Sequence, residues 1–324
     1  MPSTVKRSWK DAFFASPGPA SLKKASILSL KGLCMGSADV IPGVSGGTIA
    51  LITGIYEDLI LALKSIDANW VKKILNLDLK GALAHVHVRF LLSLFVGIGT
   101  AIISLARLMN YLLHHHPVFT WSLFFGLIAA SILVVSRRVR NWSGRVGISF
   151  AAGTVIAALI VNLIPIATPD ALWFIFLCGL IAICAMILPG ISGAFILLIL
   201  GKYEFITATL KNPFLTQHLM IIVVFCLGCL IGLLSFARLL NYMLKNFHQL
   251  TMAFLTGLMV GSMPKIWPWK EILETKMIRG KAHVIWGSNM MPQTINTEVL
   301  VALGLAILGF IIVLIIERLA REKK

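Results

Sequence analysis

Two arginines interrupt long apolar runs of the sequence, and the same two polar residue types follow each of them. Arg107 and Arg238 lie among residues otherwise suited to a membrane interior, where a single charge costs at least ~2.5–3.5 kcal/mol. The residues three and four positions later share the arginine's helix face. They are Asn110 and Tyr111 in the first run, and Asn241 and Tyr242 in the second. A guanidinium makes the planar, two-pronged contact that phosphate favours, so we expect a phosphate-binding pair with polar support. The alternative is that each arginine snorkels to the membrane surface, which leaves the matched companions unexplained.

Proline and glycine break two further apolar segments, and each break ends in a serine followed by glycine. The first break runs over 42–47 and the second over 189–193. Serine is a good helix N-cap, and the free N–H groups of a first helical turn attract anions. The residues expected to bind phosphate are therefore Ser45, Gly46, Gly47, Ser192 and Gly193. The alternative is that each motif only makes a tight turn, but its occurrence at two matching positions favours a binding site.

Three carboxylates accompany these breaks and are candidates for coupling or gating. Asp39 precedes the first break, whereas Met186 occupies the matching position before the second. An acidic group inside a membrane can carry a proton, bind Na⁺ or pair with an arginine, and it could equally cap the turn. Glu57 and Glu204 follow the two breaks at matching positions, which indicates a shared role. H⁺ or Na⁺ is accordingly the candidate coupling ion.

The composition excludes a soluble protein. Of the 324 residues, 58% are hydrophobic and 13% are charged, and the mean hydropathy is +0.90, whereas about a quarter of the residues in soluble domains are charged. Six apolar runs read as membrane-crossing helices. They are 90–113, 118–136, 146–165, 218–243, 250–263 and 297–316. The predicted fold class is therefore an all-α, polytopic membrane protein.

The two broken apolar segments read as re-entrant helical hairpins. They span roughly 27–63 and 171–206, and each contains one of the Pro-Gly breaks. Unwound backbone is tolerated at membrane depth only where it is buried in protein or lines a cavity. The alternative is that each segment is a kinked helix that crosses the membrane once.

The two halves of the chain repeat each other. Pro42, Gly43, Ser45 and Gly46 of the first break recur 147 residues later, whereas Ala194 replaces Gly47. The run 104–111 recurs 131 residues later as 235–242. The first half thus holds 16 extra residues, which fall in the polar stretch 64–89. Each unit comprises a hairpin and three crossings, an odd number, so the second unit is expected to be inverted. An inverted repeat with broken helices is typical of secondary transporters, and a duplicated structural scaffold is the alternative.

The domain organisation follows from this repeat. We expect an interfacial, cytoplasmic segment at 1–31, the first unit at 32–165, the inverted second unit at 166–316 and a cytoplasmic tail at 317–324. With both termini in the cytoplasm, the cytoplasmic segments hold 20 lysines and arginines and the outer segments hold 7, in agreement with the positive-inside rule. The net charge of +16 therefore reflects topology and not nucleic-acid binding. The segment 264–296 agrees least well with this rule, since it places five basic residues outside.

Enzyme chemistry has little support in this sequence. It shows no combination of nucleophile, base and orienting group, and no spacing typical of metal ligands. We therefore expect a transporter that needs no metal and no cofactor.

At this point the breaks can be compared with a known family. The motif from Gly36 to Thr48, with Gly54 to Tyr56 after it, closely resembles the signature of the bacterial polyprenyl-phosphate transporter family. The second motif, from Leu188 to Gly193 and then from Leu200 to Tyr203, is similar to it as well. The resemblance covers about residues 27–263, which is most of the chain.

The resemblance implies a flippase for undecaprenyl phosphate, the lipid carrier of cell-envelope polymers, in the bacterial cytoplasmic (inner) membrane. The carrier must return to the inner leaflet after its cargo is used outside, and it travels among membrane lipids. Arg107 and Arg238 would pair with the phosphate, and the turns at Ser45 and Ser192 would donate backbone N–H groups. The alternative is an ion-coupled secondary transporter of a soluble organic anion, which predicts a sealed central cavity with no opening to lipid.

Overall fold

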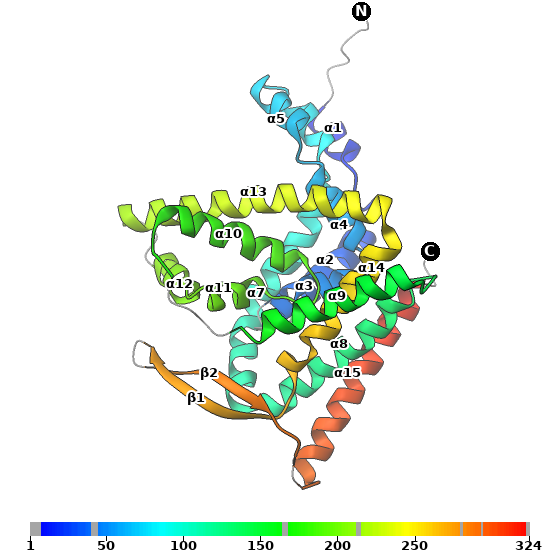
Figure 1. Ribbon diagram of the computed structural model, residues 1–324. Coiled ribbons are helices and arrows are strands. Elements are labelled where there is room, and N and C mark those ends of the chain that lie inside the picture. The colour runs from blue at the N-terminus through cyan, green and yellow to red at the C-terminus, as the bar shows by residue number, and fades with distance from the viewer. Residues whose placement is uncertain are drawn as a thin grey trace, which may run out of the picture.

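A computed structural model describes residues 8–39, 45–163, 168–211, 215–278, 281–292 and 294–321. In these ranges the chain is helical except for one two-stranded sheet (Figure 1). The elements of the first half are α1 (Trp9–Ala15), α2 (Leu22–Asp39), α3 (Gly46–Ile52), α4 (Tyr56–Lys64), α5 (Ala68–Leu75), α6 (Leu79–His85), α7 (Val88–His115), α8 (Pro117–Ser136) and α9 (Gly144–Val161). Those of the second half are α10 (Leu172–Ile187), α11 (Gly193–Ile199), α12 (Tyr203–Lys211), α13 (Thr216–Asn246), α14 (His248–Ser262), η1 (Met263–Ile266), β1 (Lys270–Ile278), β2 (Lys281–Asn289) and α15 (Thr297–Arg321).

The long helices have the length and apolarity that a membrane requires. In the described ranges, α7, α8, α9, α13 and α15 could each cross a bilayer, and α3 with α4 would be a sixth span if the bent pair counts as one. The predicted crossing 250–263 corresponds to α14, which has 15 residues and continues into η1. A helix needs about 20 residues to span the hydrocarbon core, so α14 is the short crossing. The prediction of an all-α, polytopic membrane protein is confirmed.

Each broken segment consists of one longer and two short helices. In the first, α2 ends at Asp39 and α3 begins at Gly46, while the turn residues 40–44 lie outside the described residues. The axes of α3 and α4 then meet at 117°. In the second, α10, α11 and α12 follow the same order, with a break at 188–192. Whether each segment re-enters or crosses the membrane stays a prediction.

The same glycine contacts recur in the two halves. A Cβ atom on Gly32 of α2 would clash with the carbonyl oxygen of Leu94 on α7. A Cβ atom on Gly179 of α10 would clash with the carbonyl oxygen of Phe225 on α13. These residues are related by the offsets of 147 and 131 that the sequence repeat shows. The α2–α7 and α10–α13 pairs are therefore packed backbone to backbone at equivalent positions.

The last helix of each half packs against the other half. A Cβ atom on Gly126 of α8 would clash with the carbonyl of Ala306 on α15, and one on Gly257 of α14 would clash with the carbonyl of Phe150 on α9. Gly126 and Gly257 are again 131 residues apart. The two halves thus exchange their final helices, so neither is a separate packing unit. Inversion of the second unit relative to a membrane stays a prediction.

The extra residues of the first half form a small helical module with α1. Figure 1 shows α1 and α5 at the top of the molecule, beyond α4 and α13. Asp67 caps α5 by accepting the N–H of Trp70 at 2.9 Å, and it contacts His85 of α6 at 3.0 Å. The hydroxyl of Ser16 donates to the carbonyl of Val86 at 2.7 Å and ties the end of α1 to this module. The predicted boundary at residue 31 falls inside α2.

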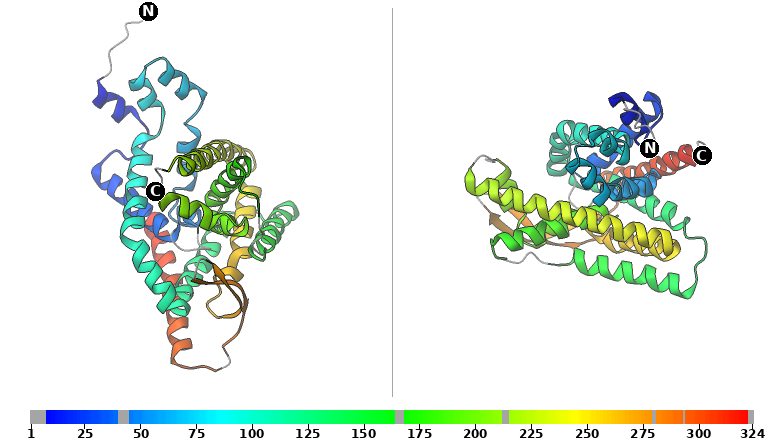
Figure 2. Two further views of the ribbon diagram at one scale, coloured as in Figure 1. Left: turned by 90° about the vertical axis from the view of Figure 1, so that its left-hand side faces the viewer. Right: turned by 90° about the horizontal axis from the view of Figure 1, so that it is seen from above.

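The segment 264–296 contains an antiparallel hairpin that the sequence analysis did not anticipate. β1 and β2 extend from the body of the molecule on the side away from the N-terminal module (Figures 1 and 2). The indole N–H of Trp267 donates to the carbonyl of Met290 at 2.9 Å, and the amide of Asn289 donates to the carbonyl of Pro264 at 2.9 Å. These two bonds fix the base of the hairpin to η1.

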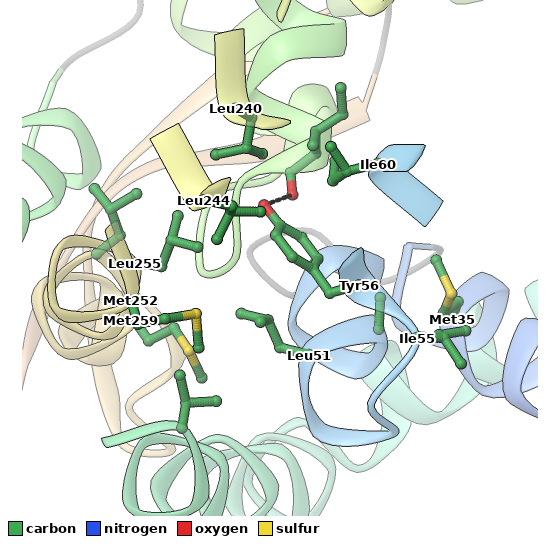
Figure 3. Close-up of a cluster of buried hydrophobic side chains, with 14 of the residues drawn as sticks. Met35, Leu51, Ile55, Tyr56, Ile60, Leu240, Leu244, Met252, Leu255 and Met259 are labelled. Atoms are coloured by element: carbon green, nitrogen blue, oxygen red, sulfur yellow. Dashed lines mark hydrogen bonds between the residues drawn. The ribbon is translucent and has the colours of Figure 1, made fainter. Parts of the chain in front are cut away.

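The core lies where the two halves meet. Figure 3 shows a cluster of buried side chains from α2, α3, α4, α13 and α14. Tyr56 lies in this cluster with 1% of its surface exposed, and its hydroxyl points toward the second break. This cluster thus joins the first broken segment to helices of the second half.

Candidate functional site

The two broken segments meet, and the first holds the main chain of the second. The hydroxyl of Ser45 lies within donating distance of two carbonyls at the end of α10, 3.0 Å from Leu188 and 3.3 Å from Met186. These carbonyls belong to the last turn of a helix, where no intrahelical partner is available to them. Ser45 therefore satisfies groups of the opposite half of the protein.

Two further bonds complete this interlock, the set of contacts between Ser45, Thr48 and Tyr56 and the main chain of residues 186–190. Tyr56 donates its hydroxyl to the carbonyl of Ile187 at 3.2 Å, and Thr48 accepts the N–H of Gly190 at 3.1 Å. Gly190 has a φ of +87°, a left-handed conformation that glycine adopts without strain. All three side chains are buried. Sequence reasoning paired Ser45 with an anion and did not assign a role to Thr48 or to the Tyr56 hydroxyl.

The N–H groups at the start of α3 have partners from the protein itself. The carboxylate of Asp39 accepts the N–H of Gly46 at 2.7 Å, and the hydroxyl of Ser45 accepts the N–H of Gly47 at 3.1 Å. Asp39 therefore bridges the break from the end of α2 to the start of α3. A carboxylate is itself an anion, so the first turn of α3 holds a negative group in this structure.

The second break is arranged differently. Ser192 is buried at the start of α11 without a side-chain cap, and a Cβ atom on Gly193 would lie 2.6 Å from the carbonyl oxygen of Ala182. Met186, which replaces Asp39 in the repeat, contributes its carbonyl to the Ser45 interaction. The two turns are thus equivalent in sequence but not in hydrogen bonding.

The two predicted arginines differ in their surroundings. Arg238 of α13 donates to the carbonyl of Ile66 at 3.0 Å, and to that of Leu234 one turn earlier at 3.2 Å. Arg107 of α7 is exposed. No hydrogen bond or ring contact joins the two arginines anywhere in the described ranges. The two arginines lie on separate helices, and both side chains are exposed at the surface of the protein.

The companions of the arginines also lie at the surface. Tyr111 stacks on His115 with ring centres 4.2 Å apart, and Tyr242 meets Phe247 edge to face at 6.2 Å. Asn241 is half-buried. The side chain of Asn110 lies outside the described residues. The predicted polar stripe is therefore seen in part, as exposed arginine and tyrosine on both helices.

The remaining predicted carboxylates lie in the first turns of α4 and α12. Glu57 of α4 approaches the imidazole of His248 at 3.4 Å, and both side chains are exposed. Glu204 is in the first turn of α12. The buried Lys202, which directly precedes α12, pairs with Asp170 and donates to the carbonyl of Thr168 at 2.7 Å. Within the described residues, no three histidine, cysteine or acidic side chains gather as a metal site.

Two cations that sequence reasoning passed over cap the far end of α3. Lys31 donates to the carbonyl of Thr53 at 2.7 Å, and Arg138 donates to that of Leu51 at 2.9 Å. Positive charge is favourable at a helix C-terminus. Both cations come from segments that the positive-inside count placed in the cytoplasm or at its border. Their separation by 107 positions left no local pattern by which the sequence could reveal this contact.

The fold and these contacts define a polytopic membrane protein whose two broken helical segments interlock. Residues 35–284 match the family described as undecaprenyl phosphate translocase-like, and the chain belongs to this family. The resemblance noted in the sequence is thereby confirmed.

Two curated relatives cover nearly the whole chain. A polyprenyl-phosphate transporter of Vibrio cholerae serotype O1 is 41% identical over 300 residues, which are 90% of this chain and 96% of the relative. A polyprenyl-phosphate transporter of Staphylococcus aureus is 29% identical over 314 residues, 91% of this chain and 97% of the relative. The comparison with solved structures found no match.

Proposed function

We propose that this chain is a flippase that moves undecaprenyl phosphate across the bacterial cytoplasmic membrane and returns it to the inner leaflet for reuse. The observation that carries the proposal is the 41% identity with a polyprenyl-phosphate transporter over 96% of that protein. Similarity over the full length includes the breaks, the long helices and both arginines' helices, so it supports a shared substrate class.

The exposure of the arginines favours a lipid substrate over a soluble anion. Arg107 and Arg238 lie on helices that are apolar enough to cross a membrane, and both side chains are exposed. In a bilayer such side chains face lipid or a lateral opening. A phosphate attached to a polyprenyl chain could reach them while its tail stays among the acyl chains. A soluble organic anion would need a route through water instead.

The turns would take part in transfer of the headgroup. Gly46, Gly47, Ser192 and Gly193 would contact phosphate, with Asp39 leaving the N–H of Gly46 as the anion arrives. Asp39 would then couple or gate transport by exchanging H⁺ or Na⁺, with Glu57 and Glu204 in supporting roles. Support for this step is that a negative group already occupies the start of α3.

The orientation proposed from the basic residues agrees with the contacts of α3. Both termini, the module of α5 and α6 and the loop at 137–145 would be cytoplasmic, and the β-hairpin would face outward. The second unit would be inverted, with a re-entrant hairpin in each unit. Lys31 and Arg138 meet at one end of α3, which supports placing their two segments on the same side.

Transport in liposomes tests this function. The purified protein is reconstituted with undecaprenyl phosphate, and the fraction of the phosphate accessible from outside is followed with and without a pH or Na⁺ gradient. We expect accelerated exchange between leaflets, with the lipid phosphate recovered chemically unchanged. Release of free phosphate would indicate an enzyme. Uptake of soluble organic anions without lipid exchange would favour the alternative transporter.

A further inference from the structure

Two lysines lie close together just after α14, one in η1 and one at the start of β1. Lys265 in η1 and Lys270 at the start of β1 are both half-buried, and the ammonium of Lys270 donates to the main-chain carbonyl of Lys265. Among the described residues, neither takes part in an ion pair. The buried Lys202, by contrast, pairs with Asp170. Charges withdrawn from water are normally paired, so this lysine pair is suited to an anionic ligand.

Aromatic rings form one side of the lysine pair. The Lys265 ammonium lies 4.3 Å from the ring centre of Phe195, and that of Lys270 lies 5.2 Å from the ring of Trp121. Such contacts stabilise a cation but provide no hydrogen-bond acceptor of carboxylate strength. An ammonium has three N–H donors, and Lys270 uses one of them on a carbonyl. Donors therefore remain for a ligand.

The pair lies between the surface and the second break. Trp121 is near the beginning of α8, whereas Phe195 is in the first turn of α11, directly after the break. A Cβ atom on Gly190 would lie 2.8 Å from the hydroxyl of Ser262, the residue before η1. The hydrogen bonds at the base of the β-hairpin hold this region in place. An anion at the lysines would thus be adjacent to the interlock.

We propose that Lys265 and Lys270 bind the phosphate monoester of a prenyl lipid, as a docking site that precedes the broken helices on the outward side. This rests on the proposed function and deepens it. Two ammonium groups match the charge of a phosphate monoester, about −1.5 to −2 near neutral pH. The half-buried ring of Trp121 offers apolar surface to the first prenyl units, which favours a lipid phosphate over free phosphate.

The electrostatics of the lysine pair favour an anionic ligand. Burial lowers the pKa of Lys270 to about 8, with a further contribution from the neighbouring Lys265. Burial also lowers the pKa of Lys265. A bound phosphate would supply the negative charge that both ammonium groups lack, and would raise both pKa values again.

Binding of farnesyl phosphate to the full-length protein in detergent tests the site. Lys265→Met and Lys270→Met keep the apolar stems against the rings but remove the charges. We expect each to weaken binding about tenfold, as for loss of a charge-assisted contact. The corresponding arginine variants should retain binding. The matched control is Lys73→Met, because Lys73 is half-buried and donates to the carbonyl of Gly81; it should bind like the wild type.

Two further measurements complete the test: binding of inorganic phosphate, and transport of undecaprenyl phosphate in liposomes. Inorganic phosphate that binds as tightly as farnesyl phosphate would overturn the lipid assignment. If the wild type moves undecaprenyl phosphate in liposomes while the double methionine variant still binds farnesyl phosphate normally, the site is wrong and the proposed function stands. If the wild type moves no undecaprenyl phosphate but both methionine variants lose farnesyl phosphate, the function is wrong and the anion site stands.

Discussion

The hydroxyl of Tyr56 lies 3.2 Å from the carbonyl oxygen of Ile187, although 131 residues separate the two in sequence. This bond joins α4, the second helix after the first break, to the last residue of α10, the helix before the second break. It lies beside the hydroxyl contacts of Ser45 and Thr48 with the same stretch of main chain. Side chains of the first broken segment therefore hold the main chain of the second, so a rearrangement of one segment must also move the other or break these bonds.

Removing the Tyr56 hydroxyl should destabilise the protein. Tyr56→Phe leaves the buried carbonyl of Ile187 without that donor, which should cost about 1–3 kcal/mol. Thermal unfolding in detergent measures the loss. Tyr203→Phe is the matched control, since Tyr203 is the repeat counterpart and 40% of its surface is exposed; it should unfold like the wild type. Equal behaviour of the two variants would contradict a structural role for the Tyr56 bond.

A larger side chain at the breaks should stop transport. A Cβ atom on Gly46 would lie 2.5 Å from Oδ2 of Asp39, and one on Gly193 would lie 2.6 Å from the Ala182 carbonyl. Gly46→Val and Gly193→Val should therefore displace these neighbours and reduce liposome transport at least about tenfold, as expected for forced overpacking. Gly304→Ala of α15 meets nothing within 4 Å and is the control. Normal transport by both valine variants would show that the turns tolerate rearrangement.

Variants of Asp39 should distinguish a role in capping α3 from a role in coupling transport to protons. In Asp39→Asn the side-chain oxygen can still accept the N–H of Gly46, so folding should change little, whereas Asp39→Ala should lose about 0.5–2 kcal/mol. If Asp39 carries the coupling proton, the asparagine variant should bind substrate but lose the pH response of transport. Rates measured across a pH gradient decide this. An active asparagine variant that still responds to pH would remove Asp39 from coupling.

The sequence predicted the parts of the fold that have local signals. Apolar runs marked the crossing helices, and the repeated Pro-Gly motifs marked both breaks. The sequence also marked Asp39 as a residue that couples, gates or caps the turn; the structure shows it accepting the N–H of Gly46, and a role in coupling stays a prediction. The contacts between the breaks could not be predicted, because Ser45 and Tyr56 bind main-chain carbonyls that any residue supplies. The lysine pair was hidden for a similar reason, since its ring partners Trp121 and Phe195 are distant in sequence.

Alanine substitution of the two arginines should affect protein stability differently. Arg107 is exposed, so Arg107→Ala should keep the protein's stability but weaken capture of undecaprenyl phosphate. Arg238→Ala also loses the bond to the carbonyl of Ile66, so a modest loss of stability, about 1 kcal/mol, should accompany lost transport. Lysine variants should recover activity only in part, because they lack the planar fork. Wild-type transport by both alanine variants would indicate that the arginines only snorkel.

Binding of farnesyl phosphate should weaken as the pH rises through about 8. Below about pH 8 the Lys270 side chain keeps its proton, and above that pH it loses its positive charge. Among the described residues, Lys265 is the charged group next to it. The ligand-free protein should show the opposite trend: the folded pKa lies below the ordinary value of 10.5, so stability rises above pH 8. Titration of binding and of the unfolding midpoint measures both. Lys270→Arg should abolish the fall in affinity.

The interlock also has a consequence for how the two breaks can evolve. Its contacts end on main-chain groups of residues 186–190, whereas the first break contributes the side chains of Ser45, Thr48 and Tyr56. Substitution of Met186 or Leu188 leaves the contacting carbonyls in place, so these positions can drift. Substitution of Ser45 or Thr48 removes the contact itself. A saturation mutagenesis library should therefore tolerate far more variety on one side of this duplicated structure than on the other.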